Sequence, residues 1–265
     1  MIGSYYDITR NNTPNFMMFK KPVTSDTLFN GRVILYQHRD GYRFSMDPVL
    51  LAHFAEVKKD GRVLDLGTGC GVIALILAYR YNRELYRVSA IEVQQGLATL
   101  ARENFKANRK FNCLGEVFRG DIRSIKQFVD AESYDMITCN PPFYTEGQGR
   151  QSVEEEARLA RHQQSGGLRD FLVAARFALT NRGCGYFIYP AEQTASLISE
   201  ASSLGFGVKK IRFVYSYPAI TRPAQLVMIK CVKNGRKDCV VLDPLYIYRE
   251  KNGPYTQEVA EYYKS

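Results

Sequence analysis

Asn140-Pro141-Pro142-Phe143 places an amide, two prolines and an aromatic ring side by side, directly after the apolar run 134–139. Two successive prolines fix the backbone and remove two donors, so the Asn140 amide and the neighbouring carbonyls are held outward. A planar exocyclic amine could donate one hydrogen to the Asn140 side-chain oxygen and one to the Pro141 carbonyl, while its ring stacks on Phe143. The alternative is an ordinary loop that leaves a strand, because Asn-Pro favours turns.

A second segment with chemical potential is Asp65-Leu66-Gly67-Thr68-Gly69-Cys70-Gly71, which lies between a strand-like run and an apolar helix-like run. Its glycines permit a tight turn and close approach of a ligand, at a strand end where open α/β sheets bind ligands. The spacing G-x-G-x-G differs from the dinucleotide fingerprint G-x-G-x-x-G and opposes a nucleotide-linked dehydrogenase. A carboxylate leads into the loop and no basic residue lies in it, so a cationic ligand fits better than a pyrophosphate.

Two carboxylates continue this pattern at later strand ends. Glu92 ends the next strand-like run, about 20 residues past the loop, where a carboxylate can accept hydrogen bonds from both ribose hydroxyls. Asp121 follows Gly120 at the end of the strand-like run after that. The alternative for both residues is simple solvation of a strand end.

These segments together resemble the S-adenosylmethionine site of class I methyltransferases. The resemblance implies that Asp65 lies near the methionine ammonium group, that Glu92 binds the ribose, and that Asp121 or the Ile122 amide lies near the adenine amine. Asp47 is expected both to cap a helix and to form a wall of the methionine pocket. The cofactor-binding residues implied in this way are Asp47, Asp65, Gly67, Thr68, Gly69, Gly71, Glu92, Asp121, Ile122 and Asn140.

The tetrapeptide 140–143 occupies the place where that family carries the motif of methyltransferases acting on planar nitrogen. The resemblance therefore implies a catalytic role for Asn140, Pro141, Pro142 and Phe143. Hydrogen bonds to Asn140 and Pro141 would orient the nitrogen, so that catalysis is mostly positioning, and Phe143 would stack on a flipped base. No strong base is needed, because the amine can lose its proton after it becomes cationic.

The segment from Tyr42 to Leu51, the short hairpin expected before it and Ala160-Arg161-His162 resemble the bacterial tRNA(Val) adenine-37 N6-methyltransferases. Gln163 departs from this pattern, since many relatives have a Glu there. The resemblance implies methyl transfer to N6 of adenine in RNA, at position 37 of a tRNA anticodon loop. Three alternatives stay open: methylation of a guanine N2 in ribosomal RNA, methylation of a protein glutamine, and a non-catalytic RNA-binding protein with the same fold.

The elements that must position these residues alternate between strand and helix from residue 61 onward, which predicts parallel strands joined by crossovers. We expect a Rossmann-like, doubly wound α/β fold with a mostly parallel, seven-stranded sheet. Eight strand-like runs are candidates for its strands: 63–66, 86–93, 116–118, 134–139, 185–189, 208–215, 225–233 and 240–248. One expected helix begins near Asp47. The others cover 72–81, 94–109, 122–129, 168–179 and 192–204.

The two ends of the chain differ from this alternation. Residues 1–30 read as an irregular lead-in, and Asp40-Gly41 between strand-like runs predicts a small hairpin within residues 31–60. Near the other end, Asn234-Gly235 predicts a turn between the last two strands, so the sheet is expected to end in antiparallel strands. We expect a single methyltransferase domain over residues 1–265, with the catalytic core at 61–265.

Composition favours an intracellular protein that contacts nucleic acid. The net charge is +9, and residues 205–265 hold 11 Lys/Arg against 5 Asp/Glu, which suits contact with a polyanion. The Lys209, Lys210 and Arg212 cluster is one candidate RNA surface, with solvation as the alternative. Six cysteines and three histidines show no metal-ligand spacing, and no apolar stretch is long enough to span a bilayer. We therefore expect no metal, no membrane and a cytoplasmic location. The oligomeric state stays open, with a monomer favoured.

Overall fold

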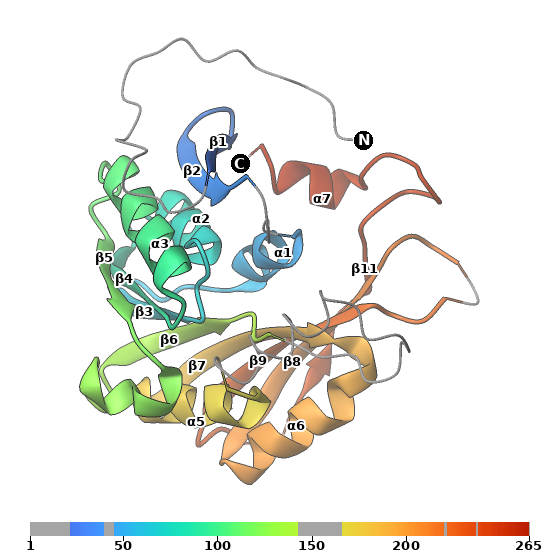
Figure 1. The fold of residues 1–265 in the computed structure, drawn as a ribbon. Coiled ribbons are helices and arrows are strands. Elements are labelled where there is room, and N and C mark those ends of the chain that lie inside the picture. Colours follow the sequence, from blue (N-terminus) through green and yellow to red (C-terminus); the bar gives the residue numbers. More distant parts are fainter. Residues whose placement is uncertain (1–21, 40–44, 143–165, 220–221, 237, 265) are drawn as a thin grey trace, which may run out of the picture.

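The computed structural model describes residues 22–39, 45–142, 166–219, 222–236 and 238–264. Within these ranges a nine-stranded sheet forms the centre of the fold, in the order β10-β8-β9-β7-β6-β3-β4-β5, with β11 also paired to β8 (Figure 1). Its strands are β3 (Gly61–Leu66), β4 (Leu85–Glu92), β5 (Leu114–Arg119), β6 (Tyr134–Cys139), β7 (Leu179–Pro190), β8 (Phe206–Tyr215), β9 (Leu226–Lys233), β10 (Val240–Val241) and β11 (Leu245–Tyr246).

Parallel pairing dominates the sheet. The strands β5, β4, β3, β6 and β7 pair in parallel, and β9 is antiparallel to both β7 and β8. The first strand of the alternating region, β3, lies between β4 and β6, which is where the strand order reverses. The predicted doubly wound, mostly parallel fold is confirmed, with its ligand-binding crevice expected at this reversal.

The prediction for the last strands was partly wrong. Residues 240–241 and 245–246 pair in parallel with β8 and do not form a hairpin with β9. Both edges of β9 are already occupied, by β7 and β8, so the nearest edge open to the chain is that of β8. Asn234, with a φ of 55°, turns the chain toward the start of β8, where its amide donates to the Gly205 carbonyl at 2.9 Å.

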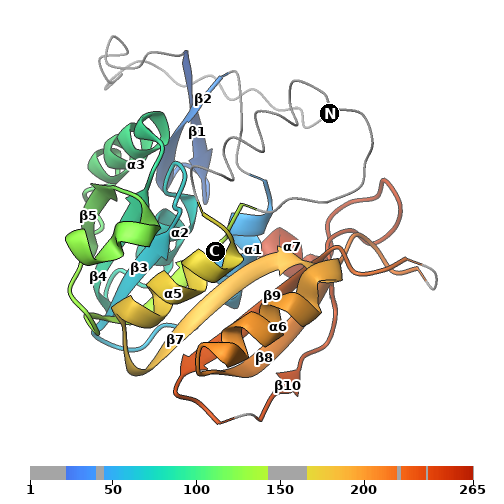
Figure 2. The same ribbon diagram turned by 60° about the horizontal axis from the view of Figure 1, so that its bottom comes forward.

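Helices cover both faces of the sheet (Figures 1 and 2). One face packs against α1 (Asp47–Phe54), α2 (Val72–Arg80) and α3 (Gln95–Ala107), and the short α7 (Gln257–Glu261) packs on the same side. The other face packs against α5 (Leu168–Ala178) and α6 (Thr194–Ser203), with the 3₁₀ segments η2 (Ile122–Gln127) and η3 (Ala191–Gln193). None of the helices in the described ranges is long and apolar enough to cross a membrane.

The amino-terminal hairpin lies earlier in the chain than predicted. Its strands are β1 (Val23–Leu28) and β2 (Val33–His38), so part of the predicted irregular lead-in is a strand. Residues 40–44, which include the predicted Asp40-Gly41 turn, lie outside the described residues. Phe29, Asn30 and Gly31 in the observed turn have φ of 54°, 53° and 84°, and an Asn-Gly pair such as 30–31 favours these left-handed values.

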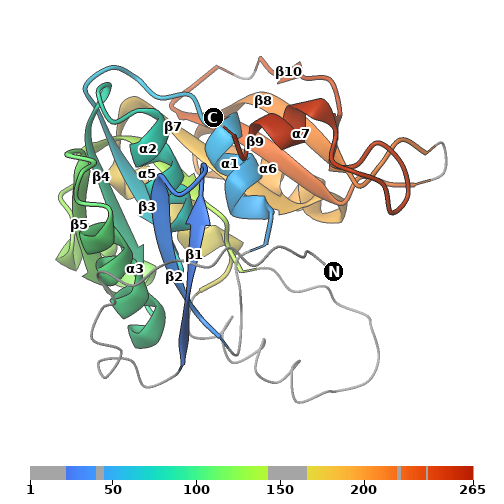
Figure 3. The same cartoon turned by 90° about the horizontal axis from the view of Figure 1, so that it is seen from above.

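The hairpin lies beside α3 (Figure 3), and two asparagines near the end of that helix fasten it to the rest of the fold. The Asn104 side chain accepts from the Tyr36 amide at 2.6 Å and donates to the Tyr36 carbonyl at 3.0 Å. Asn108, one helical turn later, makes the same pair of bonds with Ile34, at 3.0 and 2.6 Å. These amides take the place of a neighbouring strand, so an edge of β2 is satisfied by a helix.

Candidate functional site

The register of the parallel strands brings the predicted segments to one edge of the sheet. Leu66 of β3 pairs with Ile91 of β4 and with Cys139 of β6, and Glu92 of β4 pairs with Arg119 of β5. The residues that follow these pairs therefore lie at the carboxyl edge in the order of the strands. That order is Asn140, the glycine loop, Glu92 and Asp121.

The glycine loop makes a tight turn of the kind that its sequence permits, with left-handed backbone at all three glycines. Gly67, Gly69 and Gly71 have φ values of +66°, +60° and +92°. A Cβ on Gly67 would come within 3.0 Å of the Phe171 ring, whereas a Cβ on Gly69 would meet nothing within 4 Å. The Phe171 ring thus leaves no room for a side chain at Gly67. The space beside Gly69 is open to a ligand.

Asp65 is fully buried at the end of β3. Its Oδ2 accepts from the Thr68 hydroxyl at 2.5 Å and its Oδ1 accepts from the Thr138 hydroxyl at 2.8 Å. Burial raises the pKa of this carboxyl to about 7; the two hydroxyls oppose the shift and the nearby Glu92 charge adds to it. A cation bound at the loop would stabilise the ionised form of a group in this state.

Glu92 holds the glycine loop from the side of β4. Its Oε2 accepts from the Gly69 amide at 2.9 Å and its Oε1 accepts from the Gln94 amide at 2.8 Å. Burial raises the pKa of the Glu92 carboxyl, and the backbone amides oppose that shift. A hydrogen bond thus joins Glu92 directly to the glycine loop.

Asp121 follows β5 as the N-cap of η2 and has a partner of its own. Its side chain accepts from the Arg123 amide at 2.9 Å and forms an ion pair with the Arg123 guanidinium, with an Nε to Oδ2 distance of 2.9 Å. The Arg123 side chain holds the pKa of this carboxyl below its usual range. Ile122, the first residue of η2, is buried in the core beneath the edge.

Asn140 immediately follows β6, and Pro141 is buried beside it. The Asn140 side-chain oxygen is buried and has no hydrogen-bond partner among the described residues. A buried acceptor left without a donor costs about 1–3 kcal/mol. Phe143 of the predicted catalytic tetrapeptide lies outside the described residues, as do Arg161 and His162.

Asp47 lies away from this hydrogen-bonded set. It occupies the first turn of α1, with Met46 rather than Asp47 at the N-cap, so the predicted cap is displaced by one residue. Burial raises the pKa of the Asp47 carboxyl, and the Ser45 hydroxyl accepts from its amide at 3.3 Å. Within the ranges that the structure describes, no hydrogen bond joins Asp47 to the glycine loop.

Comparison with known proteins agrees with this arrangement. A family described as the methyltransferase small domain matches residues 46–179, which include the glycine loop, Glu92, Asp121 and Asn140. The chain belongs to the methyltransferase small-domain family.

Similar proteins include two named tRNA1(Val) (adenine(37)-N6)-methyltransferase. The one from Actinobacillus succinogenes is 30% identical over 83% of this chain and 88% of its own length, and the one from Trichodesmium erythraeum is 29% identical over 74% and 80%. The resemblance read from the sequence is confirmed. A crystal structure of a predicted O-methyltransferase from Agrobacterium tumefaciens shares the fold, with a TM-score of 0.66 and 21% identity over 82% of this chain and 95% of that one.

In this methyltransferase, the basic residues of the predicted RNA surface form ion pairs with carboxylates of the same chain. Lys209 pairs with Asp238, Lys210 with Glu56, and Arg212 with Glu258. The Arg212 pair is bidentate, with distances of 2.6 and 2.8 Å, and only 17% of its side chain is exposed. These three charges therefore stabilise contacts between β8 and its neighbours more than they offer a free cationic surface.

Two residues of the methyltransferase site were not anticipated from the sequence. Thr138 binds Asp65 from the adjacent strand, and Asn104 donates to the Cys70 carbonyl of the glycine loop at 2.8 Å. Thr138 could have been suspected, because it is a polar residue two positions before Asn140 in an apolar strand. The sequence signal for Asn104 was that it sits on the apolar face of a helix, where an amide is unusual. This signal was weaker, because it did not indicate what the amide binds.

Proposed function

We propose that this protein transfers the methyl group of S-adenosylmethionine to N6 of an adenine in RNA, most specifically adenine 37 of a tRNA. The observation that carries the proposal is the buried side-chain oxygen of Asn140 at the carboxyl edge of β6, for which the described residues supply no donor. An acceptor in that state is poised for an N–H donor that arrives with a substrate. An exocyclic amino group on a planar ring is such a donor.

The residues around the glycine loop fit the cofactor. Gly69 leaves open space beside its backbone, and the buried Asp65 carboxylate is a group whose ionised form a cationic ligand would stabilise. Glu92 would accept from the ribose hydroxyls, and Asp121 or the Ile122 amide would contact the adenine. S-adenosylmethionine would supply an electrophilic methyl group at this edge.

The protein's part in the reaction is to orient the acceptor nitrogen. The Asn140 oxygen and the Pro141 carbonyl would each accept one hydrogen of the amino group, which fixes the direction of the nitrogen lone pair. Phe143 is expected to stack on the ring. The nitrogen would lose its proton to solvent after transfer, so the site needs no strong base among these residues.

The names of the similar proteins support RNA as the substrate class. The similar proteins from Actinobacillus succinogenes and Trichodesmium erythraeum are named for adenine 37 of tRNA(Val). A base that is already in a loop is extruded at low cost, because it has few stacking and pairing contacts to lose. We also propose that the enzyme acts as a monomer, in one domain and in the cytoplasm.

One incubation tests this function. The protein is mixed with labelled S-adenosylmethionine, unmodified total RNA and a protein extract, and labelled RNA is digested to nucleosides. We expect label in N6-methyladenosine of the tRNA fraction. Label in N2-methylguanosine or only in protein would contradict the adenine assignment, and no consumption of the cofactor would favour a non-catalytic RNA-binding protein.

A further inference from the structure

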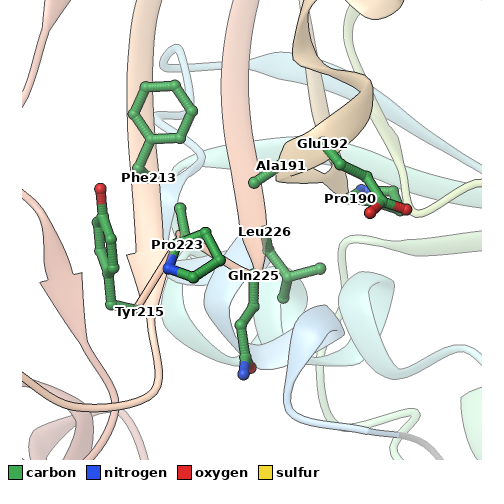
Figure 4. A pocket seen from close by; sticks show the side chains of 9 residues that line it. Pro190, Ala191, Glu192, Phe213, Tyr215, Pro223, Gln225 and Leu226 are labelled. Atoms are coloured by element: carbon green, nitrogen blue, oxygen red, sulfur yellow. The ribbon is translucent and has the colours of Figure 1, made fainter. Parts of the chain in front are cut away.

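A hollow of about 470 Å³ lies beside the proposed active site, at the ends of β7 and β8 and the start of β9. Its volume falls within the roughly 300–1,000 Å³ of typical small-ligand sites. Figure 4 shows that its lining side chains come from three segments of the chain. Its walls include Pro190, Glu192, Phe213, Tyr215, Pro223 and Gln225.

Strand register places this hollow on the same edge as Asn140. Cys139 of β6 pairs with Phe187 of β7, and β7 continues to Pro190, which pairs with Leu226 at the start of β9. Leu226 in turn pairs with Val214, so β8 also ends at this edge. Neighbouring strands lie about 4.8 Å apart, which puts the hollow one to three strand spacings from the strand that carries Asn140.

The walls of the hollow suit a flat aromatic ring. Phe213 and Tyr215 are two residues apart on β8 and present their rings on the same side of the strand. Tyr215 is supported by Tyr246, at a ring-centroid distance of 5.5 Å. Pro190 and Pro223 add apolar contact, so a ring could be held by stacking and by side contact together.

Two polar side chains in the hollow can read the edge of such a ring. The Gln225 backbone is fixed on both sides, since its amide donates to the Val214 carbonyl at 2.8 Å and its carbonyl accepts from the Ala191 amide at 3.0 Å. Its exposed side-chain amide therefore extends from a fixed backbone and offers both donors and acceptors. Glu192 adds an acceptor for an amino group.

The charge near the rim favours a nucleotide over an apolar peptide. Arg222 is exposed, and its guanidinium lies 5.0 Å from the centre of the Tyr217 ring, two residues beyond Tyr215. An arginine held in this way next to an aromatic hollow can contact a phosphate while the base occupies the hollow. The shared sheet edge makes the RNA that enters at Asn140 the nearest source of such a base.

We propose that this hollow holds an unstacked base that neighbours the target adenine in the substrate RNA, and that it contributes to the choice of sequence around that adenine. This inference rests on the proposed function. Stacking on Phe213 and Tyr215 supplies affinity, and Gln225 with Glu192 distinguishes one base from another. RNA sequence recognition of this kind operates on bases in loops, where the edges are accessible.

The test combines hollow variants with RNA that lacks single bases. The RNA is a tRNA anticodon stem-loop, and abasic sites are placed one at a time on either side of the target adenine. Binding is measured by fluorescence anisotropy for the wild type, Tyr215→Leu and Gln225→Ala. We expect wild-type affinity to fall about 10-fold at one abasic position, and both variants to bind the intact loop more weakly yet to be insensitive to that position.

Two controls keep the result interpretable. Tyr86 is 64% exposed at the start of β4, on the opposite sheet edge, so Tyr86→Leu matches the chemistry of Tyr215→Leu and should respond to every abasic site as the wild type does. Gln225→Ala covers the case in which Tyr215→Leu unfolds. It keeps the backbone bonds, because only the side chain is removed.

The outcomes separate this inference from the proposed function. If the wild type methylates the stem-loop while both hollow variants keep wild-type affinity and wild-type sensitivity to each abasic site, the hollow does not hold a base. If the loss of RNA affinity caused by a hollow variant simply adds to the loss caused by each abasic site, the assignment of a base to this hollow is likewise overturned. If the wild type methylates no RNA at all, the proposed function fails first and this inference fails with it.

Discussion

The Thr138 hydroxyl of β6 donates to the Asp65 carboxylate of β3 at 2.8 Å, and both side chains are fully buried. This bond ties the strand that begins the glycine loop to the strand that ends at Asn140. The two halves of the proposed site, which bind donor and acceptor, are therefore fixed to each other two residues below the sheet edge. A change in the distance between them would break this buried hydrogen bond.

Thr138→Val tests this connection. The substitution keeps the shape of the side chain but removes the hydroxyl, so Asp65 loses one of its donors. We expect the free energy of unfolding to fall by about 1–3 kcal/mol, since a buried acceptor is left partly unsatisfied. Urea unfolding measures the change. Thr99→Val is the matched control, because Thr99 makes only an exposed bond to its own helix and should lose far less.

Asp65 should make stability depend on pH. Its folded pKa is about 7, above the ordinary value of 3.8, so between these values the folded state keeps a proton that the unfolded state has lost. Stability without cofactor should therefore fall as pH rises from about 4 to about 7, and then level off. Asp65→Asn does not titrate and should lack this loss, so its stability relative to the wild type should increase over that range.

Urea unfolding at pH 5 and at pH 8 measures the Asp65 effect, with Asp135→Asn as a comparison. Asp135 is a partly exposed carboxylate that accepts from the Arg62 amide, and it belongs to the same sheet. A stability difference between Asp65→Asn and the wild type that stays the same at both pH values would contradict a raised pKa at Asp65.

Asn140→Ala should abolish methyl transfer, while the variant still binds the cofactor. The variant removes the buried acceptor that is proposed to orient the amino group, whereas the glycine loop and Glu92 are untouched. We expect the turnover rate to fall by at least about 100-fold, a loss typical of removing one preorganised hydrogen-bonding group. Single-turnover transfer and calorimetric binding of S-adenosylmethionine measure the two properties separately.

Asn82→Ala is the control for Asn140. The Asn82 side-chain oxygen is also buried and finds no donor in the part of the chain that the structure describes, but it lies in the turn between α2 and β4, at the other edge of the sheet. Its removal should leave the turnover rate within about twofold of the wild type. Equal losses in the two variants would mean that Asn140 acts through folding and not through the substrate.

Glu92→Gln should weaken the cofactor more than Asp121→Asn does. The Glu92 oxygens accept from two backbone amides, and a Gln would turn its NH₂ toward one of them and disturb the loop. Asp121 is partly exposed and already paired with Arg123. We expect the Kd for S-adenosylmethionine to rise at least about 10-fold for Glu92→Gln and by less for Asp121→Asn, in calorimetric titrations. The reverse ranking would show that β5 dominates recognition.

The RNA surface should involve Arg249 and Lys251 and not Lys209. The chain leaves β11 at the carboxyl edge of the sheet, because Tyr246 pairs in parallel with Tyr215, and both basic residues follow there, exposed. Arg249→Glu with Lys251→Glu should weaken RNA binding and reduce the slope of log affinity against log salt by roughly 1–2. Lys209→Glu, which breaks the pair with Asp238, should leave that slope unchanged.

How far the sequence determined the protein depends on what each residue contacts. Short-range patterns decided the strand-helix alternation, the left-handed glycines at 67, 69 and 71 and the family. These depend on local backbone preferences and on strand ends that meet at one edge. The pairing of residues 240–246 depended instead on which strand had a free edge. The pairing of β2 with β1 also depended on which segments of the chain came together in the fold. Neither is a local property.

For the site, the sequence determined which residues meet, and only the tertiary structure decided what state they are in. Asp65, Glu92, Asp121 and Asn140 could be placed at one edge because each lies at the end of a parallel strand. Their different states arise from long-range contacts: Thr138 and Thr68 hold Asp65, Arg123 occupies Asp121, and the Asn140 oxygen is buried without a donor from the described residues. Likewise, charge composition pointed to Lys209, but a carboxylate supplied by the fold neutralises it. Burial and pairing are properties of neighbours in space, and only folding brings those neighbours together.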